Sequence, residues 1–492
     1  MRVLLVYSNQ SRELEPAAPV GLSYVATATR AAGHEVRLLD LAFAYDLLQD
    51  LAREISAFKP EVVGLSIRNI DNVIAQRFDT PLDSLVEQIA VIRAHARTLQ
   101  GAPVRLVLGG PAISILAEAS LTVFDADYAI VGEGEAAFPM LLQALETGAP
   151  LSGISGLCHR VDGQPVRNRT TLLTDFAHSG MEQWVSWGPY QRGGGTWPIQ
   201  TKRGCPMSCT YCAYPLIEGK RCRLREPGEV VDEIEKVLRQ ARPRTIEFVD
   251  STFNIPASHA VAICQEIIRR KVKAHFTAMG VNPRDVPAGL FALMKRAGFN
   301  SIMITAEAGC NVMLKNYGKG FSMRQVNSCL DLATASGLKC MWFFMLGGPG
   351  ETMATCEETI RFAETRLSER QFLTVFFTGI RILPGTALAR QAVAGGHIAP
   401  ETDLSQGVFY LSPQISEAAV VERINRAAVR NPSIVQAAEG GASRQQRWLY
   451  GALNAMGVAP PYWRFVPAML KAPPLRYLRE RQLSAVASGP RR

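Results

Sequence analysis

A chain of 492 residues is too long for one hydrophobic core, and 47% hydrophobic with 20% charged residues is typical of a globular protein of two to four domains. No apolar run approaches the roughly 18 residues that cross a bilayer, and we expect neither a membrane span nor a signal peptide, which predicts a cytoplasmic protein. The net charge of +9 comes from residues 421–492, which hold twelve basic and three acidic residues, so residues 1–420 are neutral as a whole.

Residues 1–150 alternate short apolar runs with stretches of helical spacing. The predicted strands are Val3–Tyr7, Glu35–Leu39, Val62–Ile67, Arg105–Gly109 and Tyr128–Val131. Near-continuous apolar strands joined by helices predict a doubly wound, Rossmann-like parallel sheet. Such sheets bind ligands at the carboxyl ends of their strands, where glycines stand here, so residues 1–150 are predicted to be a ligand-binding domain.

Residues 151–195 are predicted to form a connector with a hairpin that turns at Asp162 and Gly163. A second alternating series begins at residue 196. Its predicted strands are Pro198–Lys202, Thr245–Val249, Ala274–Ala278, Ser301–Thr305, Lys339–Leu346 and Thr374–Ile382. Six such units predict an α/β domain over residues 196–400, a partial (β/α)6 barrel of the TIM type with its chemistry at the carboxyl ends of the strands. Residues 401–492 are expected to be a small, basic and mostly helical segment.

Three of the ten cysteines, Cys205, Cys209 and Cys212, stand within eight residues directly after the first barrel strand. The other seven are scattered singly, which excludes a disulfide framework and favours a reducing compartment. Thiolates are the usual ligands of iron–sulfur clusters, and three of them leave one iron of a [4Fe-4S] cubane open to another ligand. A zinc site with a distant fourth ligand is the alternative.

The spacing Cys-x3-Cys-x2-Cys, with Tyr211 before the third cysteine, resembles the motif of the radical S-adenosylmethionine (SAM) superfamily. The resemblance implies that SAM chelates the open iron and that one-electron reduction cleaves it to methionine and a 5′-deoxyadenosyl radical. The positions that it implies for SAM binding are Tyr211, Asp250, Ser251, Glu307, Gly347, Gly348 and Gly350. For Arg203 and Arg381, a pair with the SAM carboxylate and a solvent-exposed position both remain open.

An α/β ligand domain followed by such a barrel resembles the cobalamin (B12)-binding radical SAM family over about residues 1–400. The positions that this resemblance implies for cobalamin binding are Gly21, Leu22, Ser66, Arg68, Asn69, Gly109, Gly110, Gly132, Glu133 and Gly134. No Asp-x-His-x-x-Gly motif offers a lower ligand to cobalt, and His34 is interpreted as a surface turn residue. Ser66, Arg68 and Asn69 are therefore expected to lie under the corrin. A degenerate domain that binds nothing is the alternative.

The absence of cysteines elsewhere limits the number of clusters. Residues 1–157 contain none, unlike methylthiotransferases with a second cluster in this domain, and none follows Cys356. One cluster is therefore expected.

The resemblance implies C-methylation of an unactivated carbon, in which a 5′-deoxyadenosyl radical abstracts a hydrogen and methylcobalamin supplies the methyl group. A rearrangement, cyclisation or ring contraction without methyl transfer is the second hypothesis, and a non-catalytic cobalamin-binding protein is the third. We expect a small-molecule or lipid-like substrate and an electron donor such as flavodoxin or ferredoxin.

The C-terminal segment interleaves basic and aromatic residues. They are Arg444, Arg447, Trp448, Tyr450, Tyr462, Trp463, Arg464, Phe465, Lys471, Arg476, Tyr477, Arg479 and Arg481. A helical cap with a solvated basic face, peripheral contact with the inner membrane surface, an anionic substrate and an acidic electron donor all remain open. Nucleic acid is not expected, because no recognised binding motif accompanies the patch.

Overall fold

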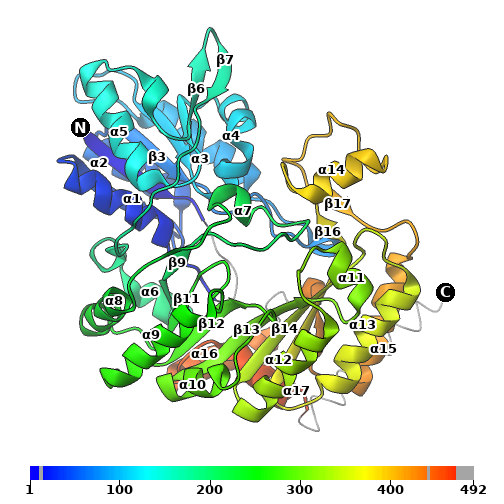
Figure 1. Ribbon diagram of the computed structural model, residues 1–492. Coiled ribbons are helices and arrows are strands. Elements are labelled where there is room, and N and C mark those ends of the chain that lie inside the picture. The colour runs from blue at the N-terminus through cyan, green and yellow to red at the C-terminus, as the bar shows by residue number, and fades with distance from the viewer. Residues whose placement is uncertain (10–14, 440–443, 472–492) are drawn as a thin grey trace.

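The structure is a computed structural model that describes residues 1–9, 15–439 and 444–471. Two α/β units stand one above the other, and their sheets are separate (Figure 1). The upper unit in this view begins at the N-terminus, and the lower unit carries the longer strands. The predicted α/β fold class is confirmed.

The upper sheet has seven strands. Its order is β2 (Glu35–Asp40), β1 (Arg2–Tyr7), β3 (Val62–Ser66), β4 (Arg105–Gly109), β5 (Tyr128–Ile130), β6 (Leu157–Val161) and β7 (Gln164–Arg167). The first five strands are parallel, whereas β6 pairs antiparallel with β5 and forms the expected hairpin with β7. The hairpin thus extends this sheet rather than standing apart as a connector.

Helices cover both faces of the upper sheet. On one face lie α1 (Val20–Ala31) and α5 (Gly134–Thr147), and on the other α2 (Leu47–Phe58), α3 (Leu82–His95) and α4 (Pro111–Val123). Helix α2 shows the local reason: Asp46 caps it by accepting from the backbone of Gln49, and its buried residues recur at helical spacing.

The lower sheet is an open half-barrel of seven parallel strands. Its order is β8 (Trp197–Ile199), β11 (Ile246–Phe248), β12 (Phe276–Val281), β13 (Phe299–Glu307), β14 (Lys339–Leu346), β15 (Phe372–Thr378) and β18 (Ile434–Gln436). The helices on its convex side are α8 (Pro227–Gln240), α9 (Ala257–Arg269), α10 (Leu290–Ala297), α12 (Met323–Ser336), α13 (Met353–Arg366) and α15 (Glu417–Arg430). Strand β18 corrects the predicted six-stranded barrel, because α15 and this three-residue strand complete a seventh unit inside the segment expected to be mostly helical.

Short elements connect these units and carry much of the site. They are α6 (Trp187–Arg192), β9 (Lys202–Arg203), α7 (Tyr214–Ile217), β10 (Arg223–Leu224), α11 (Asn311–Asn316), β16 (Ile380–Arg381), α14 (Ala387–Ala394) and β17 (Phe409–Tyr410).

The two faces of the half-barrel differ in burial. On β14 the side chains at 340, 342, 344 and 346 are buried beneath the helices, whereas Met341, Phe343 and Met345 point to the concave face and are partly exposed. The alternation follows from the two-residue period of a strand. The concave face therefore has apolar side chains that the rest of the chain does not fully cover.

The C-terminal segment closes the lower end of this concave face. It contains α16 (Arg444–Ala455), the 3-10 turn Tyr462–Phe465 and α17 (Val466–Leu470), and Tyr462 and Trp463 are buried against Met303 and Leu373. It also meets the amino ends of the strands, because Thr245 donates its hydroxyl hydrogen to the Pro460 carbonyl at 2.6 Å.

A helical cap with a solvated basic face was one of the open predictions for this segment, and the structure adds that aromatic side chains of the segment anchor it in the barrel. Several of its aromatic side chains are packed inside the barrel, although Trp448 is 76% exposed. Arg476, Tyr477, Arg479 and Arg481 lie outside the described residues. In the described part of the chain, no helix is both long enough and apolar enough to cross a membrane.

Candidate functional site

The carboxyl ends of the two sheets face each other (Figure 1). Gln76, beyond β3, donates to the Thr378 carbonyl at the end of β15 at 2.8 Å. Arg381 on β16 pairs with Asp71 of the upper unit at 2.7 Å, and Arg203 on β9 pairs with Glu133 and Glu135. The space between the units is thus bounded by residues from both.

The three clustered cysteines lie in the loop between β9 and α7, at the barrel mouth. Cys205 is buried, whereas Cys209 and Cys212 are partly exposed, and all three thiols are free. Backbone groups hold the loop from outside: Thr210 donates to the Tyr317 carbonyl at 2.9 Å and accepts from Leu388 at 2.8 Å.

Close backbone packing fixes the same loop. Gly318 has a φ of +68°, and a Cβ at this position would lie 2.4 Å from the Ser208 carbonyl oxygen. Only glycine permits this approach without strain.

The thiols of the cysteine loop act on one another electrostatically. Burial raises the pKa of Cys205, and it raises the pKa of Cys212 to about 12; the neighbouring thiols add to both shifts, and Lys319 opposes them. Thiolates are the form that binds metal, so a positively charged cluster core would reverse this tendency. The donor set fits a cubane with one iron left open.

A single metal ion fits the loop less well. Among the described residues, no three His, Cys, Asp or Glu side chains converge closely enough to hold one ion. A cubane offers a separate iron to each thiolate, so its ligands need not converge on one point. The geometry therefore favours the cluster over the zinc alternative.

A fourth thiol, Cys222, lies near this loop and was not singled out from the sequence. Its Sγ donates to the Gly204 carbonyl at 3.6 Å and reaches the Ile255 carbonyl at 3.8 Å. Burial raises its pKa. We interpret it as a neighbour of the site rather than a ligand, because its sulfur already has backbone partners.

Lys319 is a further charged residue of the site that sequence reasoning missed. It is 2% exposed, contacts the Tyr211 hydroxyl at 3.3 Å and lies 3.7 Å from a Glu307 carboxylate oxygen. Burial raises the pKa of Glu307 and Lys319 opposes that rise. Tyr211 and Glu307, both predicted SAM-binding positions, are thus brought together by a buried lysine.

The backbone at Glu307 is strained. Its φ is +69°, in the left-handed region that favours glycine, and it follows a register shift between β13 and β14. Backbone strain of this kind persists where the surrounding structure holds it, and it is common at functional sites.

Asp250, a predicted SAM ligand, is the centre of a buried structural network. Its carboxylate accepts from the Thr201 backbone at 2.7 Å, from the Thr201 hydroxyl at 2.6 Å and from the Lys202 ammonium at 3.3 Å. It is 2% exposed. Its oxygens already hold the segment that leads into the cysteine loop, and its predicted contact with SAM stays a prediction.

Ser251, the next predicted SAM position, lies at the edge of that loop. Its hydroxyl donates to Glu218 at 2.5 Å, and the same carboxylate oxygen accepts from the Gly204 backbone at 3.2 Å. Burial raises the pKa of Glu218. Glu218 is thus another site residue that sequence reasoning missed, since an isolated glutamate in a short helical turn carries no pattern.

The glycine-rich loop after β14 is held by its own glutamate. The carboxylate of Glu351 accepts from the backbone of Gly347 at 2.7 Å and of Gly348 at 3.1 Å. A Cβ on Gly348 would lie 2.1 Å from a ring carbon of Tyr317. The backbone N–H groups of Gly347 and Gly348 therefore already have an acceptor and are not free for a ligand. Gly347, Gly348 and Gly350 stay predicted SAM positions only in the sense that SAM would pack closely against their backbone.

The predicted cobalamin positions gather at the carboxyl ends of β1, β3, β4 and β5. Gly21 and Gly109 have open space where a Cβ would stand, and Leu22 packs in the sheet core. Gly110 has a φ of +102°, and a Cβ there would lie 2.4 Å from the Ile67 carbonyl oxygen. Gly132 accompanies it with a φ of +85°. The edge is open at some glycines and tightly packed at others, which suits a large flat ligand.

Arg68 and Asn69 are exposed beyond the end of β3, next to the partly exposed Ser66. Burial raises the pKa of Tyr7 to about 12, and it also raises the pKa of Glu247; in both the charge of Arg68 acts against the rise. Tyr7 ends β1 of the upper unit and Glu247 lies on β11 of the lower unit, so Arg68 faces the space between the units. Among the described residues it has no ion-pair partner.

Glu133 and Gly134 belong to an interface between the units. Glu133 accepts from Arg223 at 2.6 Å and from the Leu173 backbone at 2.7 Å, and it lies 3.2 Å from Arg203. Glu133 is therefore held by the barrel unit, and its predicted contact with cobalamin stays a prediction.

Three predictions about charged residues need correction. Arg203 and Arg381 are buried and pair with carboxylates of the upper unit, so neither is solvent-exposed nor free for a SAM carboxylate. His34 is 8% exposed rather than a surface residue, and its Nδ1 lies 3.1 Å from the N-terminal ammonium. The partners of all three lie far away in sequence.

The concave wall below the cysteine loop is mixed in character. Met279, Met341, Met345 and Phe377 are partly or well exposed on the inner face of β12, β14 and β15. Glu247 on β11 faces the same way and accepts from the Thr196 hydroxyl at 2.5 Å. An apolar wall with one carboxylate suits a small organic molecule.

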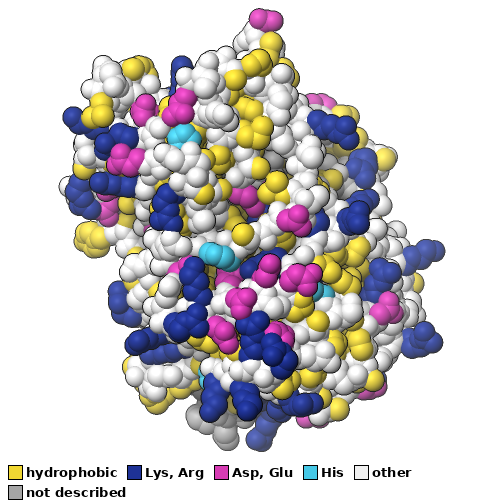
Figure 2. Space-filling view, turned by 60° about the vertical axis from the view of Figure 1, so that its left-hand side comes forward, with side chains coloured by type: hydrophobic (Ala, Val, Ile, Leu, Met, Phe, Trp, Pro, Cys, Tyr) yellow, Lys and Arg dark blue, Asp and Glu magenta, His cyan; other side chains and the backbone are white. Residues whose placement is uncertain are grey.

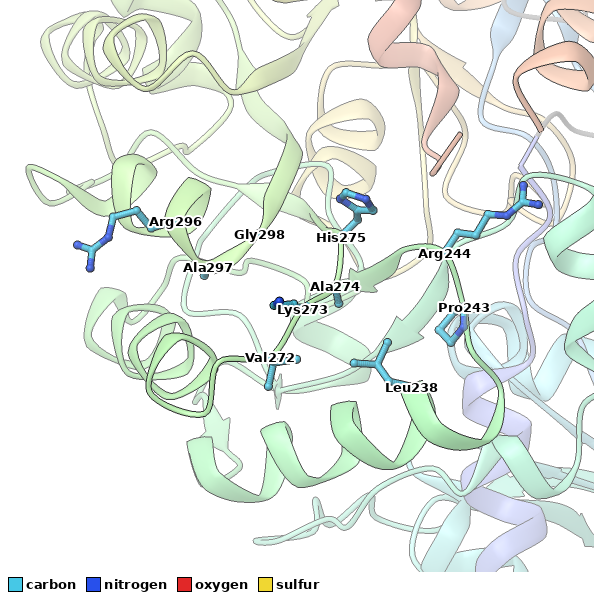
Figure 3. Close-up of a pocket in the computed structure, with 10 residues that line it drawn as sticks. All are labelled: Leu238, Pro243, Arg244, Val272, Lys273, Ala274, His275, Arg296, Ala297 and Gly298. Atoms are coloured by element: carbon cyan, nitrogen blue, oxygen red, sulfur yellow. The ribbon is translucent and has the colours of Figure 1, made fainter. Parts of the chain in front are cut away.

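A separate hollow of about 430 Å³ lies at the amino ends of β11 and β12, away from the cysteine loop (Figure 3). Its basic residues diverge, since Arg244 and Arg296 extend in opposite directions in this view. Figure 2 shows Lys and Arg side chains over the same lower part of the molecule, and Arg239, Arg269, Lys295 and Arg296 stand in the last turns of α8, α9 and α10. Basic residues at the carboxyl ends of helices interact favourably with the negative ends of the helix dipoles. This structural role accounts for them, so we assign the hollow no part in the chemistry.

Comparison with known proteins agrees with this geometry. The profile of the radical SAM superfamily matches residues 199–363, and that of the B12 binding domain matches residues 15–142. An uncharacterized methyltransferase of Pyrococcus horikoshii is 28% identical over 384 residues, which are 76% of this chain and 78% of the relative. Tryptophan 2-C-methyltransferase of Streptomyces laurentii is 27% identical over 456 residues, covering 79% and 74% of the two chains.

Solved structures share the whole fold. The radical SAM methyltransferase TsrM from Kitasatospora setae, with cobalamin and a [4Fe-4S] cluster bound, superposes with a TM-score of 0.81 at 22% identity, over 98% of this chain and 99% of that one. The cobalamin-dependent radical SAM enzyme OxsB has a TM-score of 0.70 at 14% identity, over 96% and 72%. The two domain families make a [4Fe-4S] cluster, SAM and cobalamin the cofactors of this chain. The chain belongs to the cobalamin-binding radical SAM family.

Proposed function

We propose that this protein is a C-methyltransferase that acts on an unactivated carbon of a small organic substrate. The observation that carries the proposal is the opposition of two strand-end faces, one with Cys205, Cys209 and Cys212 and the other with glycines and the exposed Arg68. Two cofactors that must act on one carbon need such an arrangement. Methyltransferases among the relatives support the same reaction.

The residues of this chain hold the cofactors in place, set the local charge and exclude water from the site. When bound, SAM and its cluster provide a 5′-deoxyadenosyl radical, and cobalamin provides a methyl group. Cys205, Cys209 and Cys212 would hold the cluster, and Lys319 places a positive charge beside them. Ser251, Tyr211 and Glu307 would bind SAM, and Glu351 keeps the glycine-rich loop in shape.

The lower face of cobalamin would meet Ser66, Arg68 and Asn69. Among the described residues, Arg68 has no ion-pair partner in the upper unit, so its guanidinium is free to turn toward a ligand at the end of β3.

The substrate would lie against the concave wall. The apolar part of the substrate would meet the side chains of Met279, Met341 and Met345, and a hydrogen-bond donor of the substrate would meet Glu247. The reacting carbon would then lie between the two strand-end faces. An apolar wall also admits a lipid-like substrate, for which hopanoid C-3 methylase of Methylococcus capsulatus, 25% identical over 344 residues, is a precedent among the relatives.

A reaction without methyl transfer is the second candidate. Anaerobic magnesium-protoporphyrin IX monomethyl ester cyclase of Rubrivivax gelatinosus is 26% identical over 390 residues, which are 74% of this chain. The mass of the product separates the two, because methylation adds one methylene and cyclisation does not.

The test uses protein reconstituted without oxygen and supplied with SAM that carries a deuterated methyl group. L-Tryptophan is the first probe, and extracts of small metabolites follow. We expect 5′-deoxyadenosine, S-adenosylhomocysteine and a product with the labelled methyl group, and neither 5′-deoxyadenosine nor the methylated product forms with the Cys209→Ala variant. A product of unchanged or hydrogen-depleted skeleton would contradict C-methylation, and the absence of SAM cleavage would favour a non-catalytic cobalamin-binding protein.

The reaction also needs an electron donor, and we propose flavodoxin or ferredoxin in the cytoplasm. All ten cysteines of the chain are free, which suits a reducing compartment. Donor docking at the C-terminal segment is disfavoured, because its described part closes the barrel at the end opposite the cysteine loop. Peripheral membrane contact would involve the exposed Trp448, and co-sedimentation with anionic vesicles tests it.

A further inference from the structure

Arg203 stands two residues before Cys205 and reaches from the barrel into the upper unit. Its guanidinium pairs with Glu135 and lies 3.2 Å from Glu133, while its Nε donates to Gln200 at 3.0 Å. The side chain is 6% exposed. A buried arginine with two carboxylates from another domain is fixed in place, since its planar donors match them in few arrangements.

Two aromatic rings hold the same guanidinium. Its central carbon lies 4.2 Å from the Phe176 ring centroid and 4.8 Å from that of Tyr24. Tyr24 belongs to α1 and Phe176 to the segment between the units. Lysine cannot reproduce both this stacking and the forked hydrogen bonds.

The carboxylates that Arg203 contacts flank the end of β5. Glu133 and Glu135 stand on either side of Gly134, where α5 begins, and Glu133 is also held by Arg223 of β10 at 2.6 Å. Both β9 and β10 border the cysteine loop, and they pair with each other. One ion-pair network therefore joins the loop that carries the cluster ligands to the strand end where cobalamin is expected.

The second interface pair differs in one informative way. Arg381 and Asp71 also join the two units, at 2.7 Å, but Arg381 lies on β16, distant in sequence from the cysteine loop. It holds the units together without being covalently close to a cluster ligand. Arg381 thus serves only to hold the two units together, whereas Arg203 also fixes the loop that carries the cluster ligands.

We infer that Arg203 couples the two cofactor sites, so that the cluster raises the affinity for cobalamin and cobalamin stabilises the cluster by the same factor. Each cofactor would favour one geometry of the shared ion-pair network, and the second to bind would find that geometry already formed. Coupling of this kind is reciprocal by thermodynamic necessity. Arg203 is a positioning residue here, and the inference rests on the cofactors of the proposed function but on no step of the reaction.

The experiment measures cobalamin affinity with and without the cluster. Hydroxocobalamin is titrated by equilibrium dialysis into the reconstituted chain and into the same chain after iron has been removed by a chelator. We expect the cluster to tighten binding about tenfold in the unaltered protein. In Arg203→Lys the ratio falls close to one, whereas a purely structural role would weaken both affinities and leave the ratio unchanged.

Two control variants and a second test variant make the result decisive. Arg381→Lys should weaken cobalamin binding but keep the ratio of the affinities with and without the cluster. Arg423 likewise pairs with two glutamates, at 2.5 and 2.8 Å, on the far helices. Arg423→Lys should therefore change neither the affinity nor the ratio. If Arg203→Lys does not fold, Glu135→Gln replaces it with the same expectation. A ratio of one in the unaltered protein, a ratio that survives in the Arg203 or Glu135 variant, or a ratio lost equally in Arg381→Lys overturns the inference.

Discussion

The two ends of the half-barrel are built from the same strands but with opposite chemistry. At the carboxyl end lie buried charges, among them Lys202 with Asp250 and Lys319 with Glu307. At the amino end the C-terminal segment inserts Tyr462 and Trp463 against apolar side chains. Burying charge is costly unless the charges are paired, whereas burying aromatic rings is favourable, so the two ends are held together by different interactions.

The difference separates residues that hold the cofactors from residues that stabilise the fold. Substitutions of the cluster ligands should alter cofactors and activity first, and substitutions of the supporting residues at either end should alter stability first. Four predictions test or refine this division.

The largest effect is expected from Cys209→Ala. Loss of one thiolate should reduce bound iron to background and lower SAM cleavage by more than the roughly 10–100-fold that loss of an outer-shell partner costs a metal site. Iron analysis and detection of 5′-deoxyadenosine measure both. Cys222→Ala is the matched control, because its sulfur is near the loop but bonded to backbone carbonyls, and it should retain the cluster. Equal iron loss in both variants would make Cys222 part of the site.

Asp250→Ala should cost about 3–5 kcal/mol in the free energy of unfolding, because it leaves the Lys202 ammonium buried without its partner. Urea denaturation of the cofactor-free chain measures the loss. Glu54→Ala, which breaks a surface pair with Arg37, should cost about 0.2–1 kcal/mol. If the Asp250 variant were as stable as the Glu54 variant but could not bind SAM, the main role of Asp250 would be SAM binding rather than stability.

At the amino end, Trp463→Ala should lower the free energy of unfolding by about 3–5 kcal/mol, since it opens a cavity beneath the concave wall. Trp448→Ala, at a 76% exposed position in the same segment, should stay within about 0.5 kcal/mol. The same denaturation series compares them. Iron content should be unchanged in either variant, and a loss of iron in Trp463→Ala would show that the two ends are not separate.

The smallest effect is a pH dependence from Glu15, whose backbone partner is Tyr462 at 3.1 Å. Burial raises its pKa from 4.5 to about 8, with Glu247 adding to the rise and Arg464 opposing it. Between pH 4.5 and about 8 the folded state therefore holds a proton that the unfolded state releases, so the contribution of Glu15 to stability is greatest below pH 4.5 and falls as pH rises toward 8. Glu15→Gln should flatten this part of the stability profile, and a profile parallel to that of the unaltered protein would contradict it.

Much of the fold was readable from the sequence because the pattern is local. The apolar runs of the two parallel sheets and the cysteine spacing lie within short windows, so the strands at Val3–Tyr7 and Lys339–Leu346 and the loop at Cys205 could be predicted. Strand β18 could not, because three residues carry no period.

The contacts of charged residues were not readable, because their partners are remote in sequence. Arg203 is separated from Glu135 by 68 positions and Arg381 from Asp71 by 310. Asp250 illustrates a related difficulty: an acidic residue at a strand end looks the same whether it binds a cofactor or a buried lysine. Lys319 and Glu218 had no motif to mark them.

The paired arginines of the first and last barrel regions have a consequence for how this protein can be dissected. Arg203 and Arg381 find their carboxylates only in residues 1–150. A fragment that began at residue 196 would lack these carboxylates and also Tyr24 and Phe176, so it would expose two cationic side chains without their partners. The barrel should therefore be expressed with the preceding residues attached, and fragments cut at the junction should aggregate or bind iron poorly.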